Sequence, residues 1–191
     1  MKRIAIFASG SGTNAQKIIE YFRDSANIEV SLVLSNNPDA YVLERASKLN
    51  VASYVFDRQL FYKTDQVHDI LLDIGTDLIV LAGFLWLVPA NLLKTWPKRI
   101  VNIHPALLPK FGGKGMYGDR VHKAVIEAGE KETGISIHYV NEVYDDGEII
   151  FQEKFEILPD DTPESIAERI HVLEHKYFPA VIEKLLLKLE N

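Results

Sequence analysis

The chain has 191 residues, of which 47% are hydrophobic and 25% charged, with a formal net charge of −6 and no cysteine. This composition excludes a disordered or fibrous chain, and the lack of cysteine excludes disulfides, thiolate nucleophiles and cysteine-bound metals. The acidic balance argues against a nucleic-acid partner, and no apolar run approaches the ~20 residues of a membrane span. We therefore expect one cytoplasmic domain over residues 1–191, without a cleavable signal.

The first hundred residues alternate short apolar runs with helical stretches. Strands are predicted at residues 3–8, 29–34, 52–56 and 77–82, and helices at residues 14–23, 40–49 and 61–74. Alternation of this kind, with fully apolar strands, predicts a parallel sheet covered on both faces. The expected fold class is α/β and doubly wound, with a Rossmann-like half over about residues 1–100.

The half over about residues 101–191 is expected to add antiparallel strands and a long terminal helix. Strands are predicted at residues 99–103, 133–140 and 148–157, a glycine-rich loop at 111–118 and a helix at 119–128. Four glycines in the loop predict a mobile stretch, as a lid or as a surface insertion without function. Thr162 and Pro163 are typical of a helix start, and Pro179 is expected to kink or interrupt that helix.

A second glycine-rich segment, Gly10-Ser11-Gly12-Thr13-Asn14, joins the first predicted strand to the first helix. Glycines let backbone amides approach a ligand, and a helix N-terminus favours an anion. With Ala15 the spacing matches a dinucleotide fingerprint, but Ser35-Asn36-Asn37 stands where that motif needs an acidic residue. A monophosphate site is favoured, and the alternative is a turn that only shapes the connection.

Asn102 and His104 lie two residues apart near the end of a predicted strand, so their side chains share one face. Asp145 and Asp146 follow in a turn some forty positions later. An amide, an imidazole and a carboxylate at one spot could hold an acyl group during transfer. Taken singly, each of these pairs also has an ordinary structural explanation, as a loop pair bonded to backbone or as a turn.

Five segments together resemble the folate-dependent formyltransferase family. They are Gly10-Ser11-Gly12-Thr13-Asn14, Leu81-Ala82-Gly83-Phe84, Asn102-Ile103-His104-Pro105-Ala106-Leu107-Leu108-Pro109, Tyr144-Asp145-Asp146-Gly147 and Glu174-His175. The glycine loop narrows the resemblance to its phosphoribosylglycinamide formyltransferase branch. The resemblance implies formyl transfer from 10-formyltetrahydrofolate to the amino group of glycinamide ribonucleotide in purine biosynthesis, without a covalent enzyme intermediate or a metal.

The resemblance also implies roles for individual positions. The catalytic roles fall on Asn102, His104 and Asp145. Substrate contacts fall on Gly12, Thr13, Asn14 and Glu174 and, through an alignment that needs a gap, on Arg58; the folate wall falls on Phe84, Leu85, Trp86, Leu87 and Val88. The chain departs from the family at Trp86, where a basic residue is common, at Arg120, where a histidine is common, and in a longer loop at 111–118.

In this chemistry Asn102 would donate an N–H to the developing oxyanion, a contact whose loss typically costs ~10² to 10³ in rate. Asp145 would favour the imidazolium form of His104, so we predict a raised pKa for His104. His138 is expected to approach the site or to be a buried structural residue. His122 and His171 are expected on helix surfaces. His171 and His175 have the i, i+4 spacing of a metal-ligand pair, but a pair of this kind is more often an ordinary helix face.

Three alternatives remain at the sequence level. Another folate-dependent formyltransferase would act on an aminoacylated tRNA or an amino sugar nucleotide, and a formyl-folate hydrolase would use water. The tRNA enzyme and the hydrolase are expected to carry extra domains for which this chain has no room. A non-catalytic nucleotide-binding module would use the glycine loop and leave the trio incidental. The expected partners are small molecules, and the protein is expected to be a monomer or a homodimer.

Overall fold

The computed structural model describes residues 1–189 and contains one seven-stranded sheet of order β3-β2-β1-β4-β5-β6-β7. The strands are β1 (Lys2–Phe7), β2 (Ile28–Ser35), β3 (Ser53–Val55), β4 (Leu78–Leu81), β5 (Ile100–His104), β6 (Glu132–Tyr139) and β7 (Ile149–Glu156). Strands β1 to β5 pair in parallel, whereas β6 is antiparallel to both of its neighbours. The predicted α/β class, with antiparallel strands in the second half, is confirmed.

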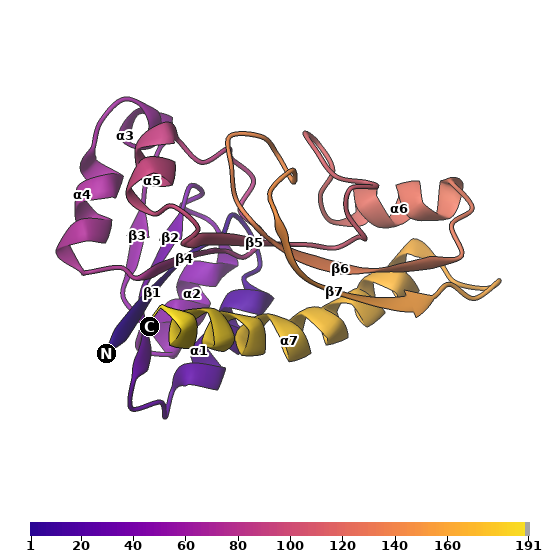
Figure 1. The fold of residues 1–191 in the computed structure, drawn as a ribbon, viewed down its shortest axis with the longest axis horizontal. Coiled ribbons are helices and arrows are strands. Elements are labelled where there is room, and N and C mark those ends of the chain that lie inside the picture. The colour runs from indigo at the N-terminus through magenta and orange to yellow at the C-terminus, as the bar shows by residue number, and fades with distance from the viewer. Residues whose placement is uncertain (190–191) are drawn as a thin grey trace.

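Helices cover both faces of the parallel part of the sheet (Figure 1). They are α1 (Thr13–Phe22), α2 (Tyr41–Lys48), α3 (Arg58–Tyr62), α4 (Gln66–Asp73), α5 (Ala90–Thr95), α6 (Asp119–Glu127) and α7 (Pro163–Lys188). One core cluster joins β1 to α1, α2 and α7 and includes Ile4, Ile18 and Phe178. The second core cluster joins β1 to α3, α4 and α5 and includes Phe7 and Phe61. Because both faces are covered, the central strands are apolar throughout.

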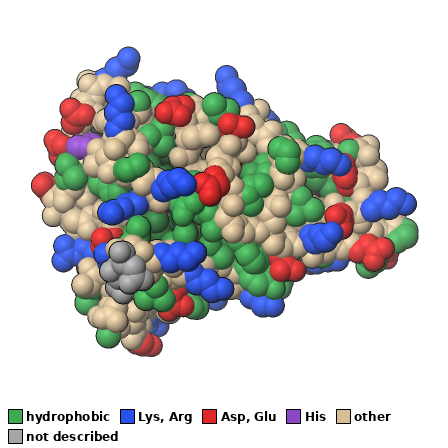
Figure 2. Space-filling view, viewed as in Figure 1, with side chains coloured by type: hydrophobic (Ala, Val, Ile, Leu, Met, Phe, Trp, Pro, Cys, Tyr) green, Lys and Arg blue, Asp and Glu red, His purple; other side chains and the backbone are tan. Residues whose placement is uncertain are grey.

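Helix α6 belongs to a smaller layer beside the antiparallel strands, toward the right of Figure 1. Val121 and Val125 pack against Ala106, in the turn that follows β5. The helix also packs against α7. Acidic and basic side chains are interspersed over the face shown in Figure 2, without a stripe of one sign.

The single helix expected at residues 61–74 is wrong, because the chain forms two short helices there. The Asp57 carboxylate accepts a hydrogen bond of 2.8 Å from the Leu60 amide, which starts α3 three residues early. The Thr64 hydroxyl donates to the Leu60 carbonyl at 2.9 Å just past the end of α3. Helix α5 was not predicted from the sequence, and the Trp96 indole anchors its end by donating to the Thr76 carbonyl at 2.8 Å.

Helix α7 begins as the sequence predicts and continues further than expected. Thr162 and Ser165 form a reciprocal capping box, and Pro163 takes the first helical position. The predicted interruption at Pro179 is wrong, since α7 runs through it to Lys188. Phe178 and Ile182 are fully buried on either side of Pro179, and this packing outweighs the one backbone hydrogen bond that proline removes.

The strand order creates a crevice at the carboxyl ends of β1 and β4. The chain leaves β1 toward β2 on one side, whereas β4 and β5 continue on the other, so the loops after β1 and β4 diverge. Ser9 ties these loops together, because its amide donates to the Gly83 carbonyl at 3.1 Å and its hydroxyl accepts from the Leu85 amide at 3.1 Å. Within residues 1–189, no helix has the length and apolar character to cross a membrane.

Candidate active site

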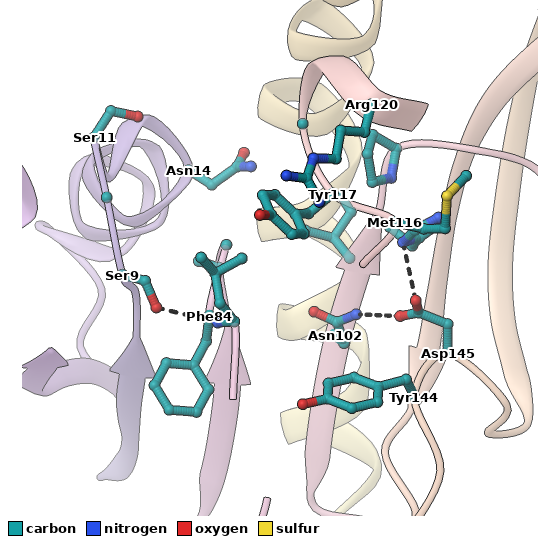
Figure 3. A pocket seen from close by; sticks show the side chains of 18 of the residues that line it. Ser9, Ser11, Asn14, Phe84, Asn102, Met116, Tyr117, Arg120, Tyr144 and Asp145 are labelled. Carbon is teal, nitrogen blue, oxygen red and sulfur yellow. Dashed lines mark hydrogen bonds and ion pairs between the residues drawn. The ribbon is translucent and has the colours of Figure 1, made fainter. Parts of the chain in front are cut away.

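A cavity of about 710 Å³ opens over the carboxyl ends of β1, β4 and β5 (Figure 3). It brings together eleven of the predicted site residues: Gly12, Thr13, Asn14, Arg58, Phe84, Leu85, Trp86, Asn102, His104, Asp145 and Glu174. Leu87 and Val88 lie outside the lining: Val88 is buried in the second core cluster, and the Leu87 carbonyl accepts from the Tyr62 hydroxyl at 2.9 Å. The predicted folate-wall residues that line the cavity are therefore Phe84, Leu85 and Trp86, of which Phe84 is also packed in the second core cluster.

Asp145 is the centre of the polar cluster on one side of the cavity (Figure 3). Its carboxylate accepts from the Gly113 amide at 2.9 Å and from the Asn102 side-chain nitrogen at 3.3 Å. The His104 Nδ1 lies 3.5 Å away and the His138 Nε2 3.6 Å away. Asp145 itself has φ 54°, a left-handed conformation that is uncommon outside glycine and recurs at functional sites.

The hydrogen bonds around Asn102 fix the orientation of its side-chain amide. His138 Nδ1 faces the Tyr139 carbonyl at 2.8 Å, which can only accept, so Nδ1 carries the proton and Nε2 accepts from the Asn102 nitrogen at 3.1 Å. The second N–H of that nitrogen is turned toward Asp145. The Asn102 oxygen consequently points away from Asp145 and into the cavity, as Figure 3 shows.

His104 is buried to 3% exposure at the end of β5. Its Nε2 donates to the Phe111 carbonyl at 2.8 Å, so in the neutral ring the unprotonated Nδ1 faces Asp145. Burial holds the pKa of His104 below its ordinary value, although the Asp145 carboxylate opposes this shift. The direction is opposite to the raised pKa predicted from the sequence, because the cost of burying an imidazolium outweighs one carboxylate at 3.5 Å.

The loop at residues 111–118 holds this cluster in place by supplying the Phe111 carbonyl and the Gly113 amide. A Cβ on Gly112 would come within 2.6 Å of the Leu108 side chain and 3.1 Å of the Asp145 Cβ, so the close approach needs glycine. Burial acts to raise the pKa of Asp145, but its contacts with His138, His104 and the Gly113 amide hold that pKa below the usual value. The Asp145 carboxylate is therefore ionised near neutral pH.

The glycine loop on the other side of the cavity has a different character. None of the backbone amides from Gly10 to Asn14 donates a hydrogen bond within the described residues. Gly12 is the N-cap of α1 with φ 73°, and no side chain caps this helix. Free amides at a helix N-terminus form a ready site for an anion. Arg45 supports the loop from outside, since its Nε donates to the Ser11 carbonyl at 2.8 Å.

Comparisons with known proteins agree with this geometry. The family model described as formyl transferase matches residues 2–182. The chain belongs to the formyl transferase family. A phosphoribosylglycinamide formyltransferase of Bacillus subtilis is 37% identical over 191 residues, which cover 97% of this chain and 95% of the relative. The solved structure of a phosphoribosylglycinamide formyltransferase from Bacillus Halodurans is 40% identical, with a TM-score of 0.88 over 100% of this chain and 98% of that one.

Some relatives of this formyl transferase are longer than the chain. The chloroplastic phosphoribosylglycinamide formyltransferase of Arabidopsis thaliana is 43% identical over 187 residues, and the chain spans 64% of its length. The trifunctional purine biosynthetic protein adenosine-3 of Drosophila melanogaster is 41% identical over 192 residues, and the chain spans 14% of it. The family therefore includes proteins that carry this unit alone and proteins in which it is one part.

Glu174 connects the two sides of this formyl transferase cavity from α7. It is only 5% exposed, and its Oε2 accepts from the Asn14 side-chain nitrogen at 2.9 Å and from His171 Nδ1 at 3.0 Å. The hydrogen bond to Glu174 raises the pKa of His171. Because both bonds use Oε2, the other oxygen of Glu174 is available to a bound molecule.

Two histidines that the sequence placed on helix surfaces line the cavity of this formyl transferase. His171 is exposed, as the sequence predicted, but it also bonds to Glu174, three residues on, and this spacing was the signal that could have placed it at the cavity. His122 is 3% exposed, not a surface residue, and burial lowers its pKa. A helical pattern with Val121 and Val125 beside it was the available sign of its burial.

At the far rim of the formyl transferase cavity, Trp86 occupies the position where the resemblance to the family led us to expect a basic residue. The Trp86 ring stacks on Tyr62 with centroids 6.0 Å apart, and the Arg58 guanidinium lies over Trp86 at 4.8 Å. A cation therefore remains at this rim, on a different residue. No group of three or more His, Cys, Asp or Glu side chains that could hold a metal occurs among residues 1–189.

Proposed function

We propose that this formyl transferase moves the formyl group of 10-formyltetrahydrofolate to the amino group of glycinamide ribonucleotide. The observation that carries the proposal is a single cavity that has free loop amides on one side and the cluster of Asp145, Asn102 and His104 on the other. A substrate with a phosphate at one end and a reacting amine at the other matches this layout. Relatives of the same length bear the name of this activity.

The phosphoribosyl group is assigned to the glycine loop. Amides of Gly12, Thr13 and Asn14 donate to the phosphate, and the N-terminus of α1 adds a favourable field for the anion. Glu174 accepts a hydrogen bond from a ribose hydroxyl through its Oε1. This placement directs the glycine amine of the substrate toward β5 and the Asp145 cluster.

The folate is assigned to the wall formed after β4. The Phe84 and Trp86 rings and the exposed Leu85 offer apolar contact, and Arg58 lies at the open rim, where a folate carboxylate would emerge. The formyl group then meets the amine above Asn102. The two substrates approach from opposite sides of the cavity, which is the arrangement that direct transfer requires.

Asn102 has two tasks in this reaction. Before attack, its oxygen faces the cavity and accepts a hydrogen bond from the substrate amine, which orients the lone pair toward the formyl carbon. As the carbonyl oxygen gains charge, an Asn102 N–H donates to it. That donation requires the longer of its present bonds, the one of 3.3 Å to Asp145, to open.

Asp145 and His104 manage the proton. The amine that attacks the formyl carbon must lose a proton, and the leaving folate nitrogen must gain one. The ionised Asp145 accepts the first, directly or through a water, and His104 Nδ1 at 3.5 Å shares it. Because the pKa of His104 is lowered, its protonated form is a stronger acid than an ordinary imidazolium, which suits it to returning the proton to a weakly basic nitrogen.

Both substrates are small molecules, and the cytoplasm, where they would be made and used, is the proposed location. We assign no nucleic acid or membrane partner to this activity. The protein is expected to act as a monomer or a homodimer. Analytical ultracentrifugation across a range of concentrations measures the state.

An acceptor comparison tests the function. Purified protein is given 10-formyltetrahydrofolate with glycinamide ribonucleotide, with an amino sugar nucleotide, or with water alone, and loss of the formyl donor is followed. We expect rapid transfer only with glycinamide ribonucleotide. Transfer to the amino sugar nucleotide alone, or release of formate at the same rate without an acceptor, contradicts the proposal.

A further inference from the structure

The phosphate side of the cavity contains polar atoms that the protein leaves without partners. Besides the free amides of the glycine loop, the Asn14 side-chain oxygen is buried and has no hydrogen-bond partner within the described residues. His122, which is 3% exposed and lines the same cavity, has an unpartnered Nδ1. Buried polar atoms without partners are rare, so we expect a bound molecule here that offers acceptor oxygens to the loop amides and a donor, such as a ribose hydroxyl, to the Asn14 oxygen.

A cation faces this region from the first turn of α6. Arg120 lines the cavity, and Figure 3 shows its guanidinium directed across the cavity toward Asn14. The guanidinium lies over the Tyr117 ring at 4.9 Å from the centroid, which holds its orientation. No ion pair among residues 1–189 includes Arg120.

Glu174, the buried carboxylate on this side of the cavity, forms no ion pair with Arg120. Glu174 is bonded to Asn14 and His171, at 2.9 Å and 3.0 Å. His171 lies close enough to α6 that Asp119 contributes, after Glu174, to raising its pKa. Helix α6 and the Glu174 side of the cavity therefore form one region, in which Arg120 is a cation without a carboxylate partner among the described residues.

We infer that Arg120 binds the phosphate of the phosphoribosyl substrate from the side opposite the glycine-loop amides. The inference rests on the proposed function and identifies a binding residue in the first turn of α6, directly after the glycine-rich loop. A guanidinium offers two parallel N–H donors to phosphate oxygens, and the loop amides donate to the remaining phosphate oxygens from the opposite side. In a protein of net charge −6, this local cation supplies attraction that the overall field lacks.

Binding measurements on the whole protein test this assignment without using formyl transfer. Calorimetry compares glycinamide ribonucleotide with its phosphate-free riboside for the wild type, Arg120→Ala and Arg120→Lys. We expect Arg120→Ala to weaken ribonucleotide binding by about 10- to 100-fold and to leave riboside binding nearly unchanged. Arg120→Lys should recover part of the loss, because it keeps the charge and loses the fork.

Lys123→Ala is the matched control, since Lys123 lies on the same helix, is exposed and does not line the cavity. It removes the same charge and should leave both affinities unchanged. Ribose 5-phosphate is a third ligand, which binds through the phosphate side even if glycinamide ribonucleotide is not the true acceptor. Equal losses for ribonucleotide and riboside, or unchanged binding of both phosphorylated ligands in Arg120→Ala, would overturn the inference.

Folding of each variant is checked by circular dichroism and thermal unfolding. Steady-state kinetics then add a second readout, in which Arg120→Ala should raise KM for the ribonucleotide more than it lowers kcat. A fall in kcat with KM unchanged would place Arg120 at the reacting atoms and contradict phosphate binding.

Discussion

The two sides of the cavity differ in how completely the protein satisfies its own polar groups. Around Asp145, the protein supplies donors of its own: the Asn102 side-chain nitrogen and the Gly113 amide donate to the carboxylate, and the His104 and His138 rings lie beside it at 3.5 Å and 3.6 Å. Around the glycine loop, the backbone amides from Gly10 to Asn14 donate to nothing within the described residues. Under the proposed function, the side around Asp145 is built before substrate arrives, and the side around the glycine loop is completed by it.

The difference corresponds to two tasks. Chemistry needs groups held in place before reaction, because reorganisation during the transition state costs rate. Binding an anion needs donors that are free, because a donor already bonded within the protein gains little from a ligand. The Asn102 bond to Asp145 is the exception on the built side, and it is also the longest hydrogen bond there, at 3.3 Å.

Asp145→Asn is the substitution that should break the built side most completely. It removes the charge that stabilises a protonated His104 and the acceptor for the amine proton, so we expect kcat to fall about 10³-fold. Binding of glycinamide ribonucleotide should change little, because the glycine loop is untouched. Steady-state kinetics measure the first effect and calorimetry the second. Asp146→Asn is the control, because Asp146 is the exposed neighbour of Asp145. Equal activity in the two variants would contradict the catalytic role.

Gly12→Ala should damage the open side. A Cβ there would lie 2.4 Å from the Val42 Cγ2 and 2.8 Å from its Cα, and φ 73° disfavours alanine. We expect a loss of about 1–3 kcal/mol in the free energy of unfolding and weaker phosphate binding. Gly10→Ala is the control, because nothing lies within 4 Å of its added Cβ. Denaturant unfolding measures the stability of the two variants, and titration with ribose 5-phosphate measures their phosphate binding. Equal stability of the two variants would contradict the described packing around Gly12.

The pKa of His104 sharpens the comparison, since burial on the built side lowers it. Histidine titration by NMR should show His104 neutral at pH 7 and becoming protonated only below about pH 6.5, its unperturbed pKa. Removing the Asp145 charge in Asp145→Asn should lower this pKa further, because that carboxylate favours the imidazolium. A titration of His104 above its ordinary value in the free protein would show that the carboxylate outweighs burial.

Ser9→Ala should have the smallest effect, because it loosens the junction between the sides without removing either. The Ser9 hydroxyl donates to the Asn36 side chain at 2.6 Å and accepts from the Leu85 amide at 3.1 Å. We expect a stability loss of about 1–2 kcal/mol and a modest rise in KM for both substrates. Ser11→Ala, whose exposed hydroxyl has no partner within the described residues, is the control and should be neutral.

The sequence predicted the parts of the fold that local patterns determine. Apolar strands at β1, β2 and β4, and the start of α7 at Thr162 and Pro163, follow from periodicity and capping. The division of residues 61–74 did not, because the Asp57 and Thr64 side chains redirect the chain by hydrogen bonds that no apolar pattern records. Pro179 was misjudged for the opposite reason, since buried neighbours keep the helix intact.

For the site, the sequence located the residues but not their states. The spacing of Asn102 and His104 predicted that their side chains share one face of the strand. In the structure both side chains contact Asp145. The direction of the His104 pKa and the orientation of the Asn102 amide depend on burial and on His138, which come from tertiary packing. The burial of His122 and the contact of the exposed His171 with Glu174 were missed because they depend on how α6 and α7 meet.

The most direct test follows a labelled formyl group. Protein is mixed with 10-formyltetrahydrofolate carrying ¹³C in the formyl carbon and with glycinamide ribonucleotide, and the fate of the label is read by NMR. Direct transfer between two substrates held on opposite sides of one cavity predicts that the label moves to the glycine amine, with little free formate. Formate as the main labelled product, at a rate unaffected by the ribonucleotide, would contradict it.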